Sequence, residues 1–262
     1  MKKELHGFYQ AFSEAISNGM RSKLDFIILE YDKNVEVHCL FLLFIKSYRH
    51  FNSIKILCKN NIFQDSFVLL RCLFESVLCC VLFAKNNKHI ERWVKYQQFI
   101  YFKEFLKDKT FIKQHPADEI AYMQKEYDAL KPLFTNRDKN SGKIYVDRQW
   151  YQGGLRAAAI EADLLENYEF CYRIGSDFVH NSSKVGQFYI DLRKKEETIK
   201  MIVGTKPSKG IDPIIIFTSI HLMLCAVDAV SKNIEIMNES TIAFWDKRLS
   251  KKMGLYKNEF LQ

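Results

Sequence analysis

The sequence feature that most restricts the possible folds of this chain is its low number of residues that interrupt helices. Among 262 residues there are only 10 glycines and 4 prolines. Each short strand of an all-β protein needs its own turn residues, whereas long helices need few. With 48% hydrophobic residues, the chain can also bury a large core. The sequence therefore predicts an all-α helical bundle.

Apolar residues recur at three- and four-residue steps over most of the chain, the spacing of amphipathic or buried helices. Asp65 or Ser66 is the expected N-cap of one of them. The predicted helices span residues 2–32 (with a break near Asn18-Gly19), 35–60, 64–84, 88–107, 116–131, 154–162, 164–179, 213–238 and 241–253. Residues 136–142 (NRDKNSG) are polar and turn-like and predict a surface loop.

After Asn181 the period of the pattern changes from helical to two residues. Phe188, Ile190 and Leu192 alternate with Tyr189 and Asp191, and Ile199, Met201 and Val203 alternate with Lys200 and Ile202. This predicts a small β-hairpin near residues 187–203, turning at Lys194 to Glu197. We expect an N-terminal helical segment at 1–34, a core domain at 35–240, and a C-terminal helix and tail at 241–262.

Cysteine usage and hydropathy indicate a cytoplasmic protein without a membrane segment. The seven cysteines are odd in number and contain no Cys-x-x-Cys pair, so neither a disulfide framework nor a zinc site is expected. Glu4 and His6 interrupt what would be a signal-peptide core. Two apolar runs fall short of about 20 uninterrupted apolar residues and are expected to be core helices. We expect no metal and no cofactor.

The charge of the chain favours a phosphate-rich partner. Lysine and arginine exceed the acidic residues by 8, and the isoelectric point is near 9.0. Such a surplus suits RNA or another acidic surface. A plain solvated surface also explains it.

The segment from Arg173 to His180 is the best candidate for a working site. The two residues are seven apart, nearly two helical turns, so both side chains leave one helix face roughly 10 Å apart along the axis. A guanidinium there can hold a phosphate, and an imidazole can exchange a proton near neutral pH. The structural alternative is equally concrete: Glu169, Arg173 and Asp177 also form an ordinary ladder of intrahelical ion pairs.

A second candidate is Arg71 with Glu75, four residues apart in an otherwise apolar helix. Two buried charges need each other, since an uncompensated one costs several kcal/mol. The pair is therefore either a structural ion pair, a catalytic pair in a buried pocket, or a support that orients the Arg173 helix.

The order of these features resembles a widespread bacterial family, the domain of unknown function 5677, over roughly residues 40 to 230. The carrying features are Arg71 with Glu75, Glu91-Arg92-Trp93, Trp150, Leu155-Arg156-Ala157-Ala158, Tyr172-Arg173 with Ser176, and Val179-His180-Asn181-Ser182. That family in turn resembles the HEPN superfamily of helical-bundle proteins, found in toxin–antitoxin and phage-defence systems. The resemblance implies a HEPN-like core with extra helices.

Active HEPN proteins are metal-independent endoribonucleases with an arginine, four to six intervening residues, and a histidine. By this resemblance Arg173 and His180, with six residues between them, are the catalytic pair. The resemblance also implies RNA as substrate, an antitoxin or defence-system partner protein, and a homodimer or higher oligomer. Supporting roles are expected for Arg71, Glu75, Ser176, Asp177 and Asn181, and substrate contacts for Arg156, Tyr172, Ser182 and Lys184.

Two other classes of function remain open from the sequence. The chain can be a non-catalytic helical binding or scaffold module of a defence system, in which Arg173 and His180 are structural or bind phosphate without cleaving. It can also be a small-molecule enzyme built on Arg71 and Glu75. The burial of the site distinguishes these hypotheses. A nuclease needs Arg173 and His180 exposed in a basic groove, with Lys184 or Arg156 nearby, whereas a scaffold would have both satisfied within the fold.

Overall fold

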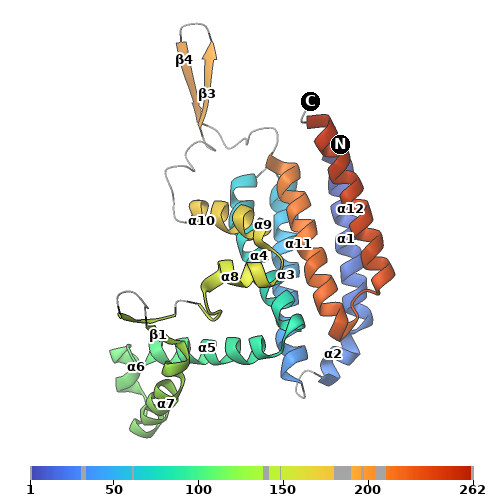
Figure 1. The fold of residues 1–262 in the computed structure, drawn as a ribbon. Coiled ribbons are helices and arrows are strands. Elements are labelled where there is room, and N and C mark those ends of the chain that lie inside the picture. Colours follow the sequence, from blue (N-terminus) through green and yellow to red (C-terminus); the bar gives the residue numbers. More distant parts are fainter. Residues whose placement is uncertain are drawn as a thin grey trace. The chain divides into compact units, whose positions relative to one another are not determined.

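The structure is a computed structural model that describes residues 2–30, 34–60, 62–137, 142–147, 149–179, 190–195, 198–203 and 211–260. It confirms an all-α fold with a small β-hairpin (Figure 1). The chain forms two compact units, one made of residues 1–85 and 164–262 and the other of residues 86–163. The expected domain boundaries at residues 34 and 240 do not coincide with these units and stay a prediction.

The first unit contains the long helices. Its elements are α1 (Lys2–Ser22), α2 (Leu24–Glu30), α3 (Val35–Lys59), α4 (Phe63–Lys85), α9 (Leu165–Asn167), the π-helix η2 (Tyr168–Arg173), α10 (Ile174–Val179), β3 (Ile190–Lys195), β4 (Thr198–Val203), α11 (Ile211–Ile234) and α12 (Glu239–Phe260). Helix α4 packs against α3, α11 and α10, and α11 also packs against α3, α12 and α1. The core lies among α3, α4 and α11, where Phe44, Phe74 and Ile220 are fully buried.

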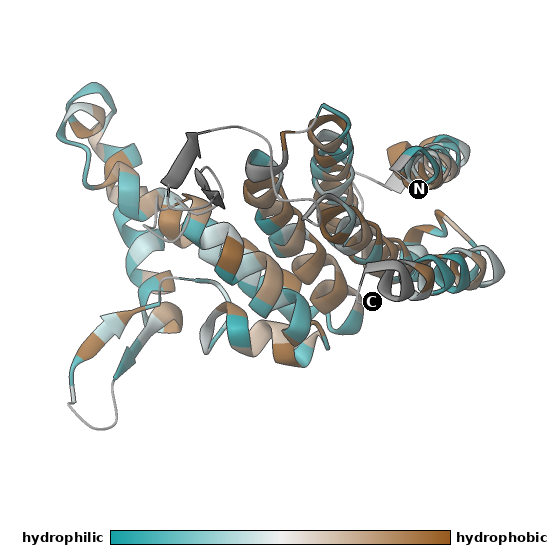
Figure 2. Cartoon of the chain, turned by 90° about the horizontal axis from the view of Figure 1, so that it is seen from above, coloured by the Kyte–Doolittle hydropathy of each residue, from teal (hydrophilic) through white to brown (hydrophobic). Residues whose placement is uncertain are grey.

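Hydropathy explains this arrangement. Helices α4 and α11 are apolar nearly all round, and a helix of that kind is stable only when its whole circumference is covered. Figure 2 shows apolar residues along the central helices of this unit, while α12, which leads to the C-terminus, carries many hydrophilic ones. The bundle therefore encloses α4, the helix that carries Arg71 and Glu75.

The same two helices are long and apolar enough to cross a membrane, by length and composition alone, over Asp65–Lys85 and Pro213–Ile234. Among the residues that the structure describes, 61% and 67% of their most apolar stretches are buried inside the fold. Because core helices of soluble proteins meet the same criteria, the two helices are weak indicators of a membrane protein.

The predicted hairpin is present in the first unit. Strands β3 and β4 pair antiparallel, with Ile190 opposite Val203 and Lys195 opposite Thr198. The two-residue alternation in the sequence thus predicted the two strands. The turn expected at Lys194 to Glu197 is misplaced, because Lys194 and Lys195 belong to β3 and pair with Ile199 and Thr198.

Several details of the expected helices are wrong: α11 ends at Ile234 rather than at 238, and α12 runs from Glu239 to Phe260 rather than over 241–253. Two further differences concern α1 and α4. Helix α1 runs through Asn18 and Gly19 and ends at Ser22, because Gly19 serves close packing rather than a break. A side-chain carbon at Gly19 would lie 2.2 Å from the carbonyl oxygen of Ile236, so only glycine permits this approach. Helix α4 begins at Phe63, and the expected N-cap Asp65 lies in its first turn.

The second unit consists of shorter elements. They are α5 (Lys88–Phe105), α6 (Lys109–Gln114), α7 (Ala117–Leu130), the 3₁₀ turn η1 (Lys131–Phe134), β1 (Thr135–Arg137), β2 (Ile144–Val146) and α8 (Gly154–Glu161). Strands β1 and β2 form a second hairpin, at whose ends Thr135 pairs with Val146 and Arg137 with Ile144. We expected only a loop at 136–142, since three polar residues such as Thr135 to Arg137 carry no two-residue hydrophobic pattern.

Arg92 joins several segments of the second unit. Its Nε donates to the Trp150 carbonyl at 2.7 Å, and its Nη1 donates to the Leu133 carbonyl at 3.3 Å. Its Nη2 lies 3.4 Å from Asp147 Oδ2, and its guanidinium lies 4.9 Å from the centre of the Phe134 ring. Arginine suits this arrangement better than any other residue, because its planar guanidinium has five N–H donors and can also lie over a ring.

Replacing Arg92 by methionine should therefore destabilise the protein. Arg92→Met keeps the apolar stem but leaves the carbonyls of Trp150 and Leu133 without their donor, which we expect to lower the free energy of unfolding by about 2–3 kcal/mol. Urea unfolding of the full chain, followed by tryptophan fluorescence, measures this. The matched control is Lys95→Met on the same helix, whose pair with Glu91 is exposed and should scarcely matter. Equal losses in both variants would contradict the role of Arg92.

Candidate functional site

The charged pair on α4 is formed as the sequence suggests. Arg71 Nε donates to Glu75 Oε1 at 3.1 Å. The Arg71 side chain is only 18% exposed, whereas that of Glu75 is 41% exposed. Arg71 is thus the more buried partner. Glu75 keeps access to solvent, so its charge is not buried as the sequence suggested.

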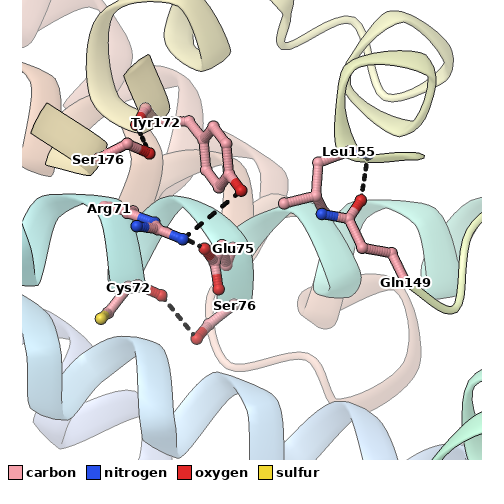
Figure 3. A network of polar contacts seen from close by, with 8 residues as sticks. All are labelled: Arg71, Cys72, Glu75, Ser76, Gln149, Leu155, Tyr172 and Ser176. Carbon is pink, nitrogen blue, oxygen red and sulfur yellow. Dashed lines mark hydrogen bonds and ion pairs between the residues drawn. The ribbon is translucent and has the colours of Figure 1, made fainter. Parts of the chain in front are cut away.

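Arg71 also reaches the helical segment that carries Arg173. Its guanidinium carbon lies 4.6 Å from the centre of the Tyr172 ring, and its Nη2 lies 3.5 Å from the Tyr172 hydroxyl. Figure 3 shows the dashed contacts from the guanidinium to Glu75 on its own helix and to this hydroxyl. The Tyr172 ring also stacks on Tyr168, with ring centres 5.1 Å apart. The Arg71 pair therefore contacts the immediate neighbour of Arg173 in the chain.

Helix α10 lies unusually close to α4 at Gly175. A side-chain carbon added to Gly175 would lie 2.7 Å from Arg71 Cβ and 2.9 Å from the Phe67 carbonyl oxygen. One turn further, Phe178 stacks on Phe67 with ring centres 5.0 Å apart. Glycine is thus required where α10 crosses the Arg71 turn of α4.

The segment between α9 and α10 is a π-helix, not the continuous α-helix that we expected over 164–179. Such wide turns are rare and are frequent at functional sites. A regular helix over this segment would turn Cys171, Gly175, Phe178 and Val179 toward the core, and the first three face it. Val179 does not, since it is 43% exposed. The π turn changes the residue spacing within the helix, so a pattern based on 3.6 residues per turn cannot place every side chain correctly.

Arg173 ends the π-helix and lies on the surface. Its side chain is 71% exposed, and its Nη1 donates to Glu169 Oε2 at 2.8 Å. This hydrogen bond and the charge of Glu169 raise the pKa of Arg173, with a smaller contribution from Asp177. The first step of the predicted ion-pair ladder is therefore formed.

The other predicted site residues fall into three groups. Ser176 is partly buried, and its hydroxyl donates to the Tyr172 carbonyl at 2.6 Å, so it braces the π turn. Arg156 is exposed on α8 and belongs to the second unit. The remaining predicted residues, His180, Asn181, Ser182 and Lys184, lie outside the described residues. The structure thus brings Arg71, Glu75, Tyr172 and Ser176 together beside Arg173.

A polar cluster in the second unit was not predicted. His89 Nε2 lies 2.6 Å from Glu161 Oε1, and the Tyr151 hydroxyl donates to the other oxygen of the same carboxylate. Burial, together with the hydrogen bond to Glu161 and its charge, raises the pKa of Tyr151 to about 12. Because His89 and Glu161 are 72 residues apart and share no motif, the sequence carries no signal for this cluster.

Neither metal ligands nor a reactive thiol stand out near Arg173. Within the described ranges, no three histidine, cysteine or acidic side chains lie together as a metal site would require. Cys171 of the π-helix is fully buried, and this burial raises the pKa of its thiol, so it remains protonated near neutral pH.

Three comparisons with known proteins were made. The family model described as "Family of unknown function (DUF5677)" matches residues 37–198, a range that includes Arg71, Glu75, Arg173 and His180. The comparisons with curated proteins and with solved structures gave no match.

Proposed function

The chain belongs to the DUF5677 family of unknown function, and from its site we propose that it is a metal-independent endoribonuclease. Arg173 and His180 are its catalytic pair, and the protein acts as a toxin or phage-defence effector. The resemblance of the family to HEPN proteins supports this function. So does the arginine–histidine spacing, since six residues separate Arg173 from His180.

The observation that carries the proposal is the exposure of Arg173. Arg92 of the second unit illustrates the opposite case, because its donors are held by the Trp150 and Leu133 carbonyls and are not free for a ligand. Arg173 is instead 71% exposed and is paired with one carboxylate. Its guanidinium has five donors in a fixed fork, so donors other than Nη1 can bind a phosphate while Glu169 stays in place.

The chemistry follows from the two side chains. His180 takes the proton of a ribose 2′-hydroxyl, and the 2′-oxygen attacks the adjacent phosphorus. The bond to the 5′-oxygen breaks, and that oxygen leaves with a proton taken from a water molecule, while the protonated His180 later gives its proton to solvent. Arg173 stabilises the extra negative charge on the phosphoryl oxygens during this step. The products are a 2′,3′-cyclic phosphate and a 5′-hydroxyl, and no metal or cofactor takes part.

A second candidate function is a non-catalytic binding or scaffold module of a defence system. The ion pair of Arg173 with Glu169 favours it, because this pair also stabilises the helix without any substrate. Both functions have the same setting: a cytoplasmic protein with a surplus of 8 positive charges, an RNA or acidic partner, a cognate antitoxin or defence protein, and a homodimer or higher oligomer.

The nuclease proposal is tested by induced expression in a bacterial host. Wild-type protein should stop growth and fragment total RNA, while Arg173→Ala and His180→Ala should do neither. Arg21→Ala is the matched control, since Arg21 is also an exposed helical arginine and should behave as wild type. Intact RNA and normal growth with the wild type, in the absence of any antitoxin and with any activator supplied, would exclude a nuclease. Unreduced toxicity of Arg173→Ala would exclude this site.

A further inference from the structure

We infer that Arg71 is a positioning residue that acts through Tyr172 to hold the π turn, and thereby sets the direction in which Arg173 leaves the helix. The catalytic consequence rests on the proposed function. The structural part does not, because it concerns only contacts among α4, η2 and α10.

The position of the Arg71 guanidinium favours its contact with Tyr172 and is not explained by fold stability alone. Its Nε is held by Glu75, and its face lies over the Tyr172 ring at 4.6 Å. Its Nη1 is buried and has no hydrogen-bond partner in the part of the chain that the structure describes. A buried donor left in this state costs about 1–3 kcal/mol, which an apolar side chain would avoid. The contact with Tyr172 explains why an arginine stands here.

Tyr172 makes three contacts, two through its ring and one through its backbone carbonyl. The Arg71 guanidinium covers one region of the ring, Tyr168 stacks on it nearly parallel at 14°, and Ser176 donates to its carbonyl at 2.6 Å. Consecutive residues of a helix point roughly a quarter turn apart. While Tyr172 is directed toward Arg71, Arg173 is consequently directed away from α4, where its side chain is 71% exposed. Loss of the Tyr172 contact would let the wide turn relax and redirect Arg173.

The stacked face of the guanidinium separates this role from that of a simple ion pair. Lysine in place of Arg71 keeps the charge beside Glu75 but has no planar group to lie over a ring. Phenylalanine in place of Tyr172 keeps the ring and loses only the long 3.5 Å contact of its hydroxyl. If Arg71 acts through the ring, Arg71→Lys should expose Cys171 as Tyr172→Leu does, and Tyr172→Phe should leave Cys171 as protected as it is in wild type.

Cys171 offers a local readout of the π turn. It is fully buried next to Tyr172, and Cys80 is a fully buried matched control within α4. Alkylation of the purified full chain with iodoacetamide, resolved by peptide mass spectrometry, compares the two thiols. In Arg71→Lys and Tyr172→Leu we expect Cys171 to react at least about ten-fold faster than in wild type while Cys80 stays protected. RNA cleavage should fall by about 100-fold in the same two variants.

The other outcomes also decide the matter. Protection of Cys171 in both variants would overturn the inference, and joint labelling of Cys171 and Cys80 would do so as well, because it would show a general stabilising role. Faster labelling in Tyr172→Phe would contradict an action through the ring. If the wild type cleaves no RNA, the proposed function fails, and the labelling of Cys171 still tests the positioning role of Arg71.

Discussion

Alanine in place of Gly175 is expected to lower the rate of RNA cleavage by about 100-fold. The added carbon would lie 2.7 Å from Arg71 Cβ and 2.9 Å from the Phe67 carbonyl oxygen, and neither atom is the mobile end of a side chain. Helix α10 must therefore move away from α4 and take with it the chain segment between Arg173 and His180. A displacement of about 1 Å at a catalytic group lowers a rate by about 100-fold. The overpacking also costs about 1–3 kcal/mol of stability.

Cleavage of a labelled RNA and urea unfolding measure the two effects of Gly175→Ala. The matched control is Gly254→Ala in α12, where a side-chain carbon would have nothing within 4 Å. The control should keep full activity and normal stability. Wild-type cleavage by a folded Gly175→Ala protein would show that the close approach of α10 to α4 is not needed by the site.

Among the glycines that the structure describes, Gly19 is the one at which alanine is expected to cause the largest loss of stability. Its added carbon would lie 2.2 Å from the backbone carbonyl oxygen of Ile236, a distance that no side-chain rearrangement can relieve. We expect the free energy of unfolding to fall by about 3 kcal/mol or more. Thermal or urea unfolding of the full chain measures it.

The control for Gly19 lies in the same helix and should respond in the opposite sense. Gly7 of α1 is exposed and has nothing within 4 Å of the position of an added carbon. Gly7→Ala should therefore raise the free energy of unfolding by about 1 kcal/mol, the difference in helix propensity between the two residues. Similar losses for both substitutions would mean that α1 does not pack on Ile236 as described.

The long helices could be predicted from the sequence because their apolar residues recur at helical spacing, which indicates buried helices. The pattern over 35–60 corresponds to α3 at Val35–Lys59, and that over 64–84 to α4 at Phe63–Lys85. The hairpin of β3 and β4 was likewise visible as a two-residue period. The prediction of a helix break at Gly19 was wrong because the role of Gly19 depends on Ile236, more than 200 residues away. Helix propensity describes the residue alone and not its contacts with distant segments.

The candidate site was predictable in its composition and less so in its geometry. The four-residue spacing of Arg71 and Glu75 gave the ion pair, and that of Glu169 and Arg173 gave another. The contact of Arg71 with Tyr172, 101 residues away, and the π turn depend on tertiary packing. A helical pattern with one fixed period cannot contain them.

The central claim is that Arg173 and His180 cleave RNA without a metal. The most direct measurement is incubation of purified wild-type, Arg173→Ala and His180→Ala proteins with single-stranded RNA of mixed sequence in EDTA, followed by analysis of the new ends. The proposed mechanism predicts fragments with 2′,3′-cyclic phosphate and 5′-hydroxyl ends from the wild type, and intact RNA from both variants. Equal cleavage by the variants, or cleavage by the wild type only after addition of Mg²⁺, would contradict it.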